Sequence, residues 1–250
     1  MRKNGSLIGP ANVPSLSGAK GLWTLQDVYA AQRQSTWPAA GGDPYIAYVT
    51  AIYHFNNDYD DALAIAPTPT QQGTGCAVSS AQSKFGGYSL LSPSSSGYLL
   101  AADDAAFNFN GGAFTIEFWA RRNSNTGFHY VLCKGTTGSE WAVAFNGSSF
   151  GVYYGGSSFG TLPDDTTGSW HHYAIAYDGS GMVYAFQDGE VVTGQGASGD
   201  VDATGELYFG RDGAAASGYF DGYIDDIRIT KGICRWTSAF DPPTLEHLEF

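Results

Sequence analysis

The sequence reads GYFDGYIDDIRITKG over residues 218–232, and its centre, residues 223–230, predicts an extended strand. β-Branched and aromatic residues fill this centre and glycines stand on both sides of it, which is typical of a strand between tight turns. Because side chains alternate along a strand, we expect Asp225 and Asp226 to point to opposite faces. One then faces solvent and the other must meet a partner or a metal ion, since an unpaired buried carboxylate is costly.

The composition extends this prediction to the whole chain. The 250 residues include 34 glycines, and 15% of them are aromatic, whereas only 14% are charged. Short strands joined by tight turns produce such a composition, so the predicted class is all-β. Strand-like runs recur about every eight to twelve residues from residue 113 to residue 229, which favours two packed antiparallel sheets. Asp188-Gly189 is the sharpest hairpin signal among them.

The charge balance excludes one class of partner. Twelve basic and 24 acidic residues give a formal net charge of −12, which repels a nucleic-acid backbone. The same acidity suits divalent cations, and it also suits plain solubility. No run approaches the length of a membrane span and the N-terminus lacks a signal-peptide pattern, so we expect neither membrane insertion nor Sec export.

Three cysteines, Cys76, Cys133 and Cys234, lie far apart in the sequence. Their odd number and the lack of a CxxC pair argue against a zinc site or a disulfide framework. We therefore expect buried free thiols, with a single bridge as the alternative.

Residues 1–44 form a separate N-terminal arm in this interpretation. Residues 1–19 are polar and loop-like, and Thr24 with Asp27 then has the spacing of a capping box. A short amphipathic helix of about ten residues follows and ends before Pro38. A helix this short needs a partner, so its apolar face must pack on the sandwich or on a neighbouring subunit. The expected docking residues are Trp23, Leu25, Tyr29 and Trp37.

Four stretches, taken in order, resemble the laminin-G-like, concanavalin-A-like lectin and glucanase superfamily. They are AFTIEFWARR at 113–122, WHHYAIAYDG at 170–179, LYFGRDG at 207–213 and the opening stretch at 218–232. The resemblance spans about residues 48–243. It implies a jelly-roll sandwich of two antiparallel sheets over residues 45–250. Members of this superfamily bind sugars, bind proteins, cleave glycans or only fill space in a larger assembly.

The resemblance also implies a structural Ca2+ site. The sequence NNDYDD follows the expected first strand, residues 47–55, where family members often bind calcium together with an aspartate of the final strand. Calcium takes several oxygen ligands at about 2.4 Å. The stretch lacks the spacing of an EF-hand, and an acidic surface loop explains it as well. The expected ligands are Asn56, Asp58, Asp60, Asp61 and Asp225.

Catalysis is not expected, although the superfamily contains glycanases. Glycoside hydrolysis needs two carboxylates about 5 to 10 Å apart, which the best-known glucanases of the family supply from an E-x-D-x-x-E strand. Glu117 stands without such a partner in TIEFWA, so we interpret it as a buried or ion-paired structural residue. His171 and His172 are adjacent on a strand and face opposite ways, so they cannot ligate one ion, and we expect packing and hydrogen bonding instead.

Sugar binding is the better supported hypothesis. Exposed aromatic rings stack on the apolar faces of pyranose rings. Phe128, His129 and Tyr130 form one candidate group, and a second group surrounds the glycine-rich loop GGSSFG at 155–160. The expected glycan-binding residues are Phe128, Tyr130, Tyr153, Tyr154 and Phe159.

The pattern WTLQDVY, followed by WP at 37–38, resembles a segment of tailed-bacteriophage structural proteins that occurs beside lectin-like domains. Together the two resemblances imply a non-enzymatic virion component, either a head decoration or a tail or fibre protein. Its arm would bind other virion proteins, and many copies would make weak binding to host or environmental glycans useful. Two alternatives stay open, namely a purely architectural cement protein and a free carbohydrate-binding module.

Overall fold

The structure is a computed structural model that describes residues 43–135, 140–196, 204–213 and 217–249. The chain divides into one unit of Met1–Ile46 with Phe250 and a second unit of Ala47–Glu249, which holds all the described strands. The predicted docking helix, with Trp23, Leu25, Tyr29 and Trp37, lies outside the described residues. Among the described residues, no helix has the length and hydropathy of a membrane span.

Fifteen strands and two short 3-10 helices, η1 (Ile46–Tyr48) and η2 (Ala105–Phe107), make up the described secondary structure. The strands are β1 (Val49–Tyr53), β2 (Thr70–Gln72), β3 (Ala77–Ser79), β4 (Ser89–Ser92), β5 (Tyr98–Ala101), β6 (Phe114–Arg122), β7 (Phe128–Lys134), β8 (Trp141–Asn146), β9 (Ser149–Tyr154), β10 (Ser157–Thr161), β11 (Trp170–Tyr177), β12 (Met182–Gln187), β13 (Glu190–Gly196), β14 (Leu207–Phe209) and β15 (Gly222–Lys231).

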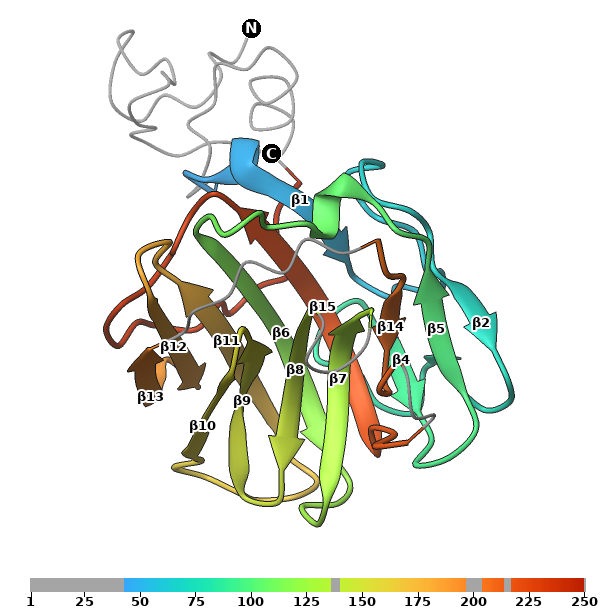
Figure 1. The fold of residues 1–250 in the computed structure, drawn as a ribbon. Helices are drawn as coiled ribbons and strands as arrows, with labels where there is room; N and C mark the ends of the chain where they lie inside the picture. Colours follow the sequence, from blue (N-terminus) through green and yellow to red (C-terminus); the bar gives the residue numbers. More distant parts are fainter. Residues whose placement is uncertain (1–42, 136–139, 197–203, 214–216, 250) are drawn as a thin grey trace, which may run out of the picture. The chain divides into compact units, whose positions relative to one another are not determined.

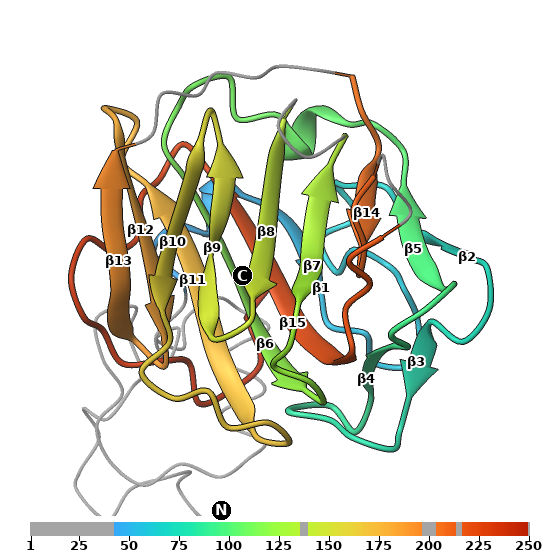
Figure 2. The same cartoon turned by 60° about the horizontal axis from the view of Figure 1, so that its bottom comes forward.

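The strands form two antiparallel sheets. The eight-stranded sheet has the order β13-β12-β11-β6-β15-β4-β3, with β1 also paired to β15, and the seven-stranded sheet has the order β10-β9-β8-β7-β14-β5-β2. Figures 1 and 2 show β7, β8 and β9 side by side in one layer and β6, β11 and β15 in the other. The predicted jelly-roll sandwich of two antiparallel sheets is therefore confirmed, and β1, the first strand, pairs with β15, the last.

Alternating side chains build the core between the sheets. On β6, Phe114, Ile116 and Phe118 are fully buried in this core, as the alternation predicts. Phe145 of the facing sheet packs edge-on against Tyr173 of β11, with ring centroids 4.8 Å apart. Each such side chain contributes about 1.5–3 kcal/mol by leaving water, so this apolar layer is the main source of stability.

The prediction that Asp225 and Asp226 point to opposite faces is wrong. In the pairing of β15 with β6, Asp225 lies opposite Trp119 and Arg228 opposite Glu117, so β15 has one residue more than β6 over this interval. Asp226 takes up the extra residue with a left-handed backbone, at φ 50°. This β-bulge shifts the alternation, and both carboxylates lie fully buried on the outer side of the eight-stranded sheet.

The predicted hairpin at Asp188-Gly189 is confirmed. Both residues have positive φ, 49° and 80°, in the two-residue turn between β12 and β13.

The prediction that GGSSFG is a loop is wrong. Only Gly155 and Gly156 form the turn, and β10 begins directly after them. The short strands β2 and β3 were also missed. Cys76, Cys133 and Cys234 form no disulfide within the described residues, and the first two are buried.

The close packing at the β12–β13 turn gives a test of the fold. A Cβ on Gly189 would lie 1.8 Å from the carbonyl oxygen of Phe240, whereas a Cβ on Gly127, at a similar φ of 83°, would have nothing within 4 Å. We expect Gly127→Ala to cost about 1–2 kcal/mol of backbone strain, which lowers the melting temperature by a few degrees. Gly189→Ala should lower it at least twice as far, since the backbone around Phe240 must also move. Equal shifts in thermal unfolding would contradict the packing of residues 232–249 on this turn.

Candidate functional site

The outer face of the seven-stranded sheet carries a row of aromatic and small residues. Across β7, β8, β9 and β10, the residues paired in register are Tyr130, Ala144, Gly151 and Phe159. Tyr130, Ala144, Ala142 and Cys133 form a buried apolar cluster that is separate from the main core. The two small residues at the centre of the row therefore leave room for the larger rings on either side to meet above the sheet.

Four rings meet there, and we define Phe128, Tyr130, Tyr153 and Phe159 as the aromatic patch. Phe128 lies 6.1 Å from Tyr130, 6.4 Å from Tyr153 and 6.3 Å from Phe159, measured between ring centroids. Tyr153 lies 5.1 Å from Phe159 and 6.4 Å from Tyr130. Phe128 is the most exposed, at 39%, so the patch presents ring surface to solvent. Four of the five predicted glycan-binding residues thus lie together on the outer face, with Tyr130 buried beneath the other rings at 8% exposure.

The fifth residue, Tyr154, was predicted wrongly. It is 3% exposed and packs in the core against Phe114 and Tyr177, with ring centroids 5.1 and 5.0 Å away. Tyr153 and Tyr154 are neighbours on one strand, so alternation allows only one of them to reach the outer face. His129 is also structural, since its two ring nitrogens lie 2.8 and 2.7 Å from the carbonyl oxygens of Tyr219 and Thr126.

The outer face of the eight-stranded sheet is different, because the C-terminal segment, residues 232–249, covers it. The rings of Trp236 and Phe240 stack 3.7 Å apart, and Phe240 packs on Phe186 of β12 and His172 of β11. Thr115 of β6 donates a hydrogen bond to the carbonyl oxygen of Ile233. Strand residues below this segment are consequently buried on both sides of the sheet.

A network of charged side chains lies beneath the C-terminal segment. Glu117 is fully buried and accepts hydrogen bonds from Nε and Nη2 of Arg228 at 2.8 and 2.6 Å. Its other oxygen lies 3.2 Å from Nε2 of His172 and 3.3 Å from Nε2 of His247. Burial alone would raise the pKa of Glu117, but Arg228 and His247 hold that pKa well below its usual value. The prediction of a buried, ion-paired glutamate is confirmed.

His171 and His172 have separate partners, as predicted. His171 lies with Nδ1 2.6 Å from Asp188 Oδ2, whereas His172 contacts Glu117. The hydrogen bond to Asp188 raises the pKa of His171, and burial lowers the pKa of His172. Packing and hydrogen bonding account for both rings.

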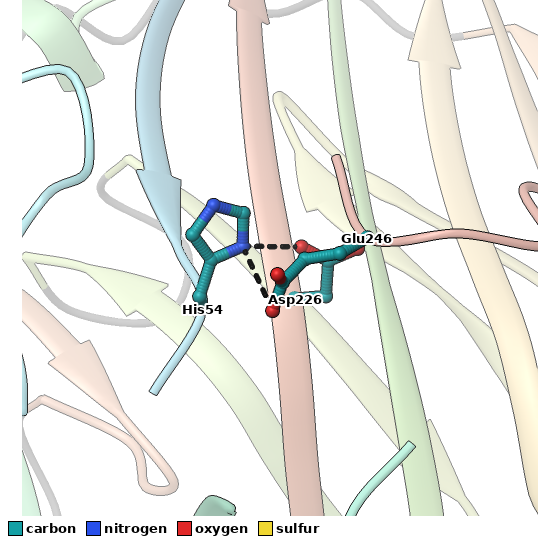
Figure 3. A group of neighbouring side chains, drawn as sticks. All are labelled: His54, Asp226 and Glu246. Atoms are coloured by element: carbon teal, nitrogen blue, oxygen red, sulfur yellow. Dashed lines mark hydrogen bonds and ion pairs between the residues drawn. The ribbon is translucent and has the colours of Figure 1, made fainter. Parts of the chain in front are cut away.

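His54, Asp226 and Glu246 form a second cluster, and its potential ligand atoms lie within 4.8 Å of one another. Figure 3 shows Nδ1 of His54 contacting both carboxylates, at 2.7 Å from Asp226 and 3.6 Å from Glu246. Asp226 also accepts hydrogen bonds from the backbone N–H of His247. Despite burial, the charge of His247 lowers the pKa of Asp226 to about 2, and Asp226 raises the pKa of His54. These contacts anchor the C-terminal segment on β15, and no sequence motif predicted them.

Three of the predicted calcium ligands make other contacts. The carboxylate of Asp61 accepts hydrogen bonds from backbone N–H groups of Ile52, Leu63, Ile65 and Ala66, so it organises the loop after β1. Asp58 and Asp60 are exposed. Asp58 accepts a hydrogen bond from the backbone N–H of Asp60, and the Asp60 carboxylate accepts one from the hydroxyl of Thr68. The donor set therefore does not fit a calcium site of five converging side chains.

The remaining two residues, Asn56 and Asp225, flank one loop. Asp225 Oδ2 accepts hydrogen bonds from the backbone N–H groups of Lys84 and Phe85, and a Cβ on Gly86 would lie 1.6 Å from Asn56 Oδ1. Asn56 Oδ1 and Asp225 Oδ1 are buried acceptors without a hydrogen bond in the described structure. Such oxygens fit a hard cation, so calcium at these two residues stays a prediction. Burial, with Asp226 and Glu246 nearby, raises the pKa of Asp225 to about 7.

This raised pKa predicts how stability changes with pH. The folded-state pKa of Asp225 lies above the ordinary value of 3.8, so folding becomes progressively less favourable as pH rises from about 4 to about 7. Asp225→Asn removes the ionisation and keeps an oxygen for the N–H groups of Lys84 and Phe85. In the presence of a chelator, we expect this variant to melt several degrees above the wild type at pH 8 and at nearly the same temperature at pH 4.

Asp241→Asn, which changes an exposed aspartate, is the control and should leave the pH profile unchanged. The loss of protonated His54 and His247 above pH 6.5 affects all three proteins alike, so the difference isolates Asp225. Added calcium should raise the melting temperature of the wild type but not of Asp225→Asn. If calcium and chelator give the same wild-type curve, the calcium prediction is wrong.

Comparisons with known proteins agree with this architecture. No curated protein matches the sequence. Among solved structures, domain 4 of AbnA, a GH43 extracellular arabinanase from Geobacillus stearothermophilus in complex with arabinotriose, has a TM-score of 0.59 and 19% identity, and the match covers 74% of this chain and 92% of that domain.

Two toxin domains are similar as well. The binding domain of botulinum neurotoxin DC in complex with SialylT has a TM-score of 0.57, and the binding domain of Paraclostridial Mosquitocidal Protein 1 has 0.56. Both are 12% identical, and both matches cover 79% of this chain and 50% of the toxin domain. The chain thus spans about half the length of these toxin domains, and at such identities the likeness concerns the fold alone.

A family model, the laminin-G-like model of the concanavalin A-like lectin/glucanases superfamily, matches residues 93–234. These residues include β6, β11, β14 and β15, which hold the four stretches that first indicated the fold. Since the match covers more than half of the chain, this protein belongs to that family of the concanavalin A-like lectin/glucanases superfamily.

Proposed function

We propose that this protein is a non-enzymatic glycan-binding module, displayed in many copies on the particle of a tailed bacteriophage. The aromatic patch on the outer face of the seven-stranded sheet is its binding surface. Its rings stack on the apolar faces of sugar rings, and weak single contacts add up through the many copies.

The asymmetry between the two outer faces is the observation that supports this proposal. Residues 232–249 cover the outer face of the eight-stranded sheet over β6, β11 and β12, whereas the patch residue Phe128 is 39% exposed. A contiguous exposed apolar patch on a protein surface is a common mark of a binding site, and here the exposed ring of Phe128 adjoins the partly exposed rings of Tyr153 and Phe159. The solved structures with arabinotriose and SialylT bound belong to proteins of similar fold, which favours a sugar as the ligand.

The environment of the buried carboxylates supports a non-enzymatic role. A general acid in glycoside hydrolysis needs an accessible carboxyl group with a raised pKa. Glu117 has a lowered pKa and is fully buried. Asp225 has a raised pKa, but it too is fully buried, and the backbone of Lys84 and Phe85 holds one of its oxygens. Neither carboxylate is positioned to meet a glycosidic bond.

The virion role rests on the N-terminal sequence. The stretch WTLQDVY at 23–29 resembles segments of tailed-phage structural proteins, and residues 1–44 would bind other virion proteins. Head decoration and tail or fibre location are both compatible with this proposal.

Loss of one patch ring tests the binding surface. Tyr153→Ala removes the ring nearest to Phe159, so we expect binding to the best ligands on a multivalent glycan array to fall about tenfold, the equivalent of about 1.4 kcal/mol. Tyr223→Ala is the matched control, because Tyr223 is also half-buried but lies on β15 of the other sheet. Equal losses in both variants, with unchanged melting temperatures, would exclude the patch as the binding surface.

Deletion of residues 1–40 tests the virion role. We expect the deleted protein to keep its glycan binding, since the sandwich of Ala47–Glu249 has its own core, but to be absent from purified phage particles. Western blotting of the particles and the glycan array provide the two measurements. Incorporation without the arm would contradict the docking role. The architectural alternative would be favoured if the deletion weakens the phage particles and the full-length protein binds no glycan on the array.

A further inference from the structure

The aromatic surface continues past the four rings of the patch. Tyr208 on β14 packs against the cluster that contains Tyr130, and the ring of Tyr98 on β5 lies 5.8 Å from that of Tyr208. Their neighbours Leu99, Leu207 and Phe209 point into the core, so both tyrosines lie on the outer face. The ligand surface proposed above can thus extend from β10 to β5, over six neighbouring strands or about 24 Å.

Arg211 lies at the β14–β5 end of this surface. The carbon of its guanidinium group is 4.3 Å from the ring centre of Tyr98, 5.2 Å from that of Tyr208 and 5.9 Å from that of Tyr219. Nε and Nη2 donate hydrogen bonds to the backbone carbonyl oxygens of Asp212 and Gly213, at 2.7 and 3.0 Å. These bonds and the rings fix the plane of the guanidinium group.

Arg211 is only 8% exposed, and among the described residues it forms no ion pair. The other buried cations of the sandwich each have a carboxylate partner. The pairs are Arg122 with Asp165, Lys134 with Asp103 and Glu140, and Arg228 with Glu117. A buried cation without an anion is costly, and contacts with tyrosine rings recover part of that cost.

Two carboxylates close to Arg211 in sequence, those of Asp212 and Glu206, have other contacts. Asp212 is 7% exposed, and its Oδ1 lies 3.7 Å from the thiol of Cys133. Glu206 accepts a hydrogen bond from the hydroxyl of Tyr208 at 3.2 Å. The chain has twice as many acidic as basic residues, yet Arg211, on the proposed ligand face, forms no ion pair within the described residues. This favours a ligand that supplies the anion.

From this arrangement we propose, on the basis of the proposed function, that the ligand is an acidic glycan. Its sugar ring stacks on Tyr98 and Tyr208, and its carboxylate or sulfate group accepts hydrogen bonds from the guanidinium group of Arg211. Nε and one N–H of Nη2 already donate to backbone carbonyl oxygens, so the anion accepts from the remaining N–H groups of Nη1 and Nη2. One N–H on each of these two nitrogens forms a parallel pair that suits both carboxylate and sulfate.

Paired glycans test this proposal with the full-length chain displayed multivalently. The probes are oligogalacturonate with its methyl ester, and a sulfated galactan oligosaccharide with its desulfated form. We expect the wild type to bind one acidic member at least about tenfold more tightly than its neutral partner, and the preference to shrink as salt is added. The pair that shows the preference identifies the anion as carboxylate or sulfate.

Arg211→Gln should bring the ratio of acidic to neutral binding to about one. Arg121→Gln is the matched control, because Arg121 lies over a tyrosine ring, that of Tyr223, on the other sheet. The ratio of acidic to neutral binding of this variant should equal that of the wild type. If Arg211→Gln unfolds, Arg211→Lys keeps the charge but loses the planar contact, and it should give an intermediate ratio.

Distinct outcomes would overturn the two proposals. A wild type that binds neutral glycans but shows no preference within either pair would exclude the acidic ligand and leave the glycan-binding function intact. A folded Arg211→Gln that keeps the preference would exclude Arg211 as its source. A wild type that binds no glycan on the array would overturn the proposed function and the acidic ligand with it.

Discussion

The ion pair between Glu117 and Arg228 joins the two central strands of the eight-stranded sheet. Both side chains are buried, and the pair lies directly beside the bulge at which β15 gains its extra residue. Removal of one partner would leave a buried charge uncompensated, which typically costs about 3–5 kcal/mol. The same glutamate contacts His172 and His247, so a single carboxylate joins β6, β11, β15 and the C-terminal segment.

This network determines which face of the sandwich is available to a ligand. His247 contacts Glu117 through its ring and Asp226 through its backbone N–H, and together with Trp236 and Phe240 it fixes the C-terminal segment on the eight-stranded sheet. On the outer face of the seven-stranded sheet, Phe128 is instead exposed, and Tyr153 and Phe159 are partly exposed. The charge cluster on one side of the core therefore leaves the outer face of the other sheet, the proposed binding surface, uncovered by this segment.

Local patterns were sufficient to predict most strands. The predicted strand 223–230 lies within β15, and the predicted first strand, 47–55, contains β1, because alternation and glycine turns depend only on neighbouring residues. Strand β10 was missed, since SSFGT has little β-branched character and is a strand only through its pairing with β9. The orientation of Asp226 was missed for a similar reason, because a bulge depends on the partner strand as well as on the bulged one.

The sequence by itself determined the all-β class and the family, and it named the four residues of the aromatic patch among its candidates. Its glycine turns, alternating apolar residues and short motifs are local features, and they persist whatever the rest of the chain does. Only the tertiary structure decided that Tyr154 points into the core, that both aspartates of β15 are buried and that Arg211 lies among three tyrosines. These features depend on contacts between residues far apart in the chain, such as His54 with Asp226 and Glu117 with His247. No local pattern specifies which distant strand a side chain will meet.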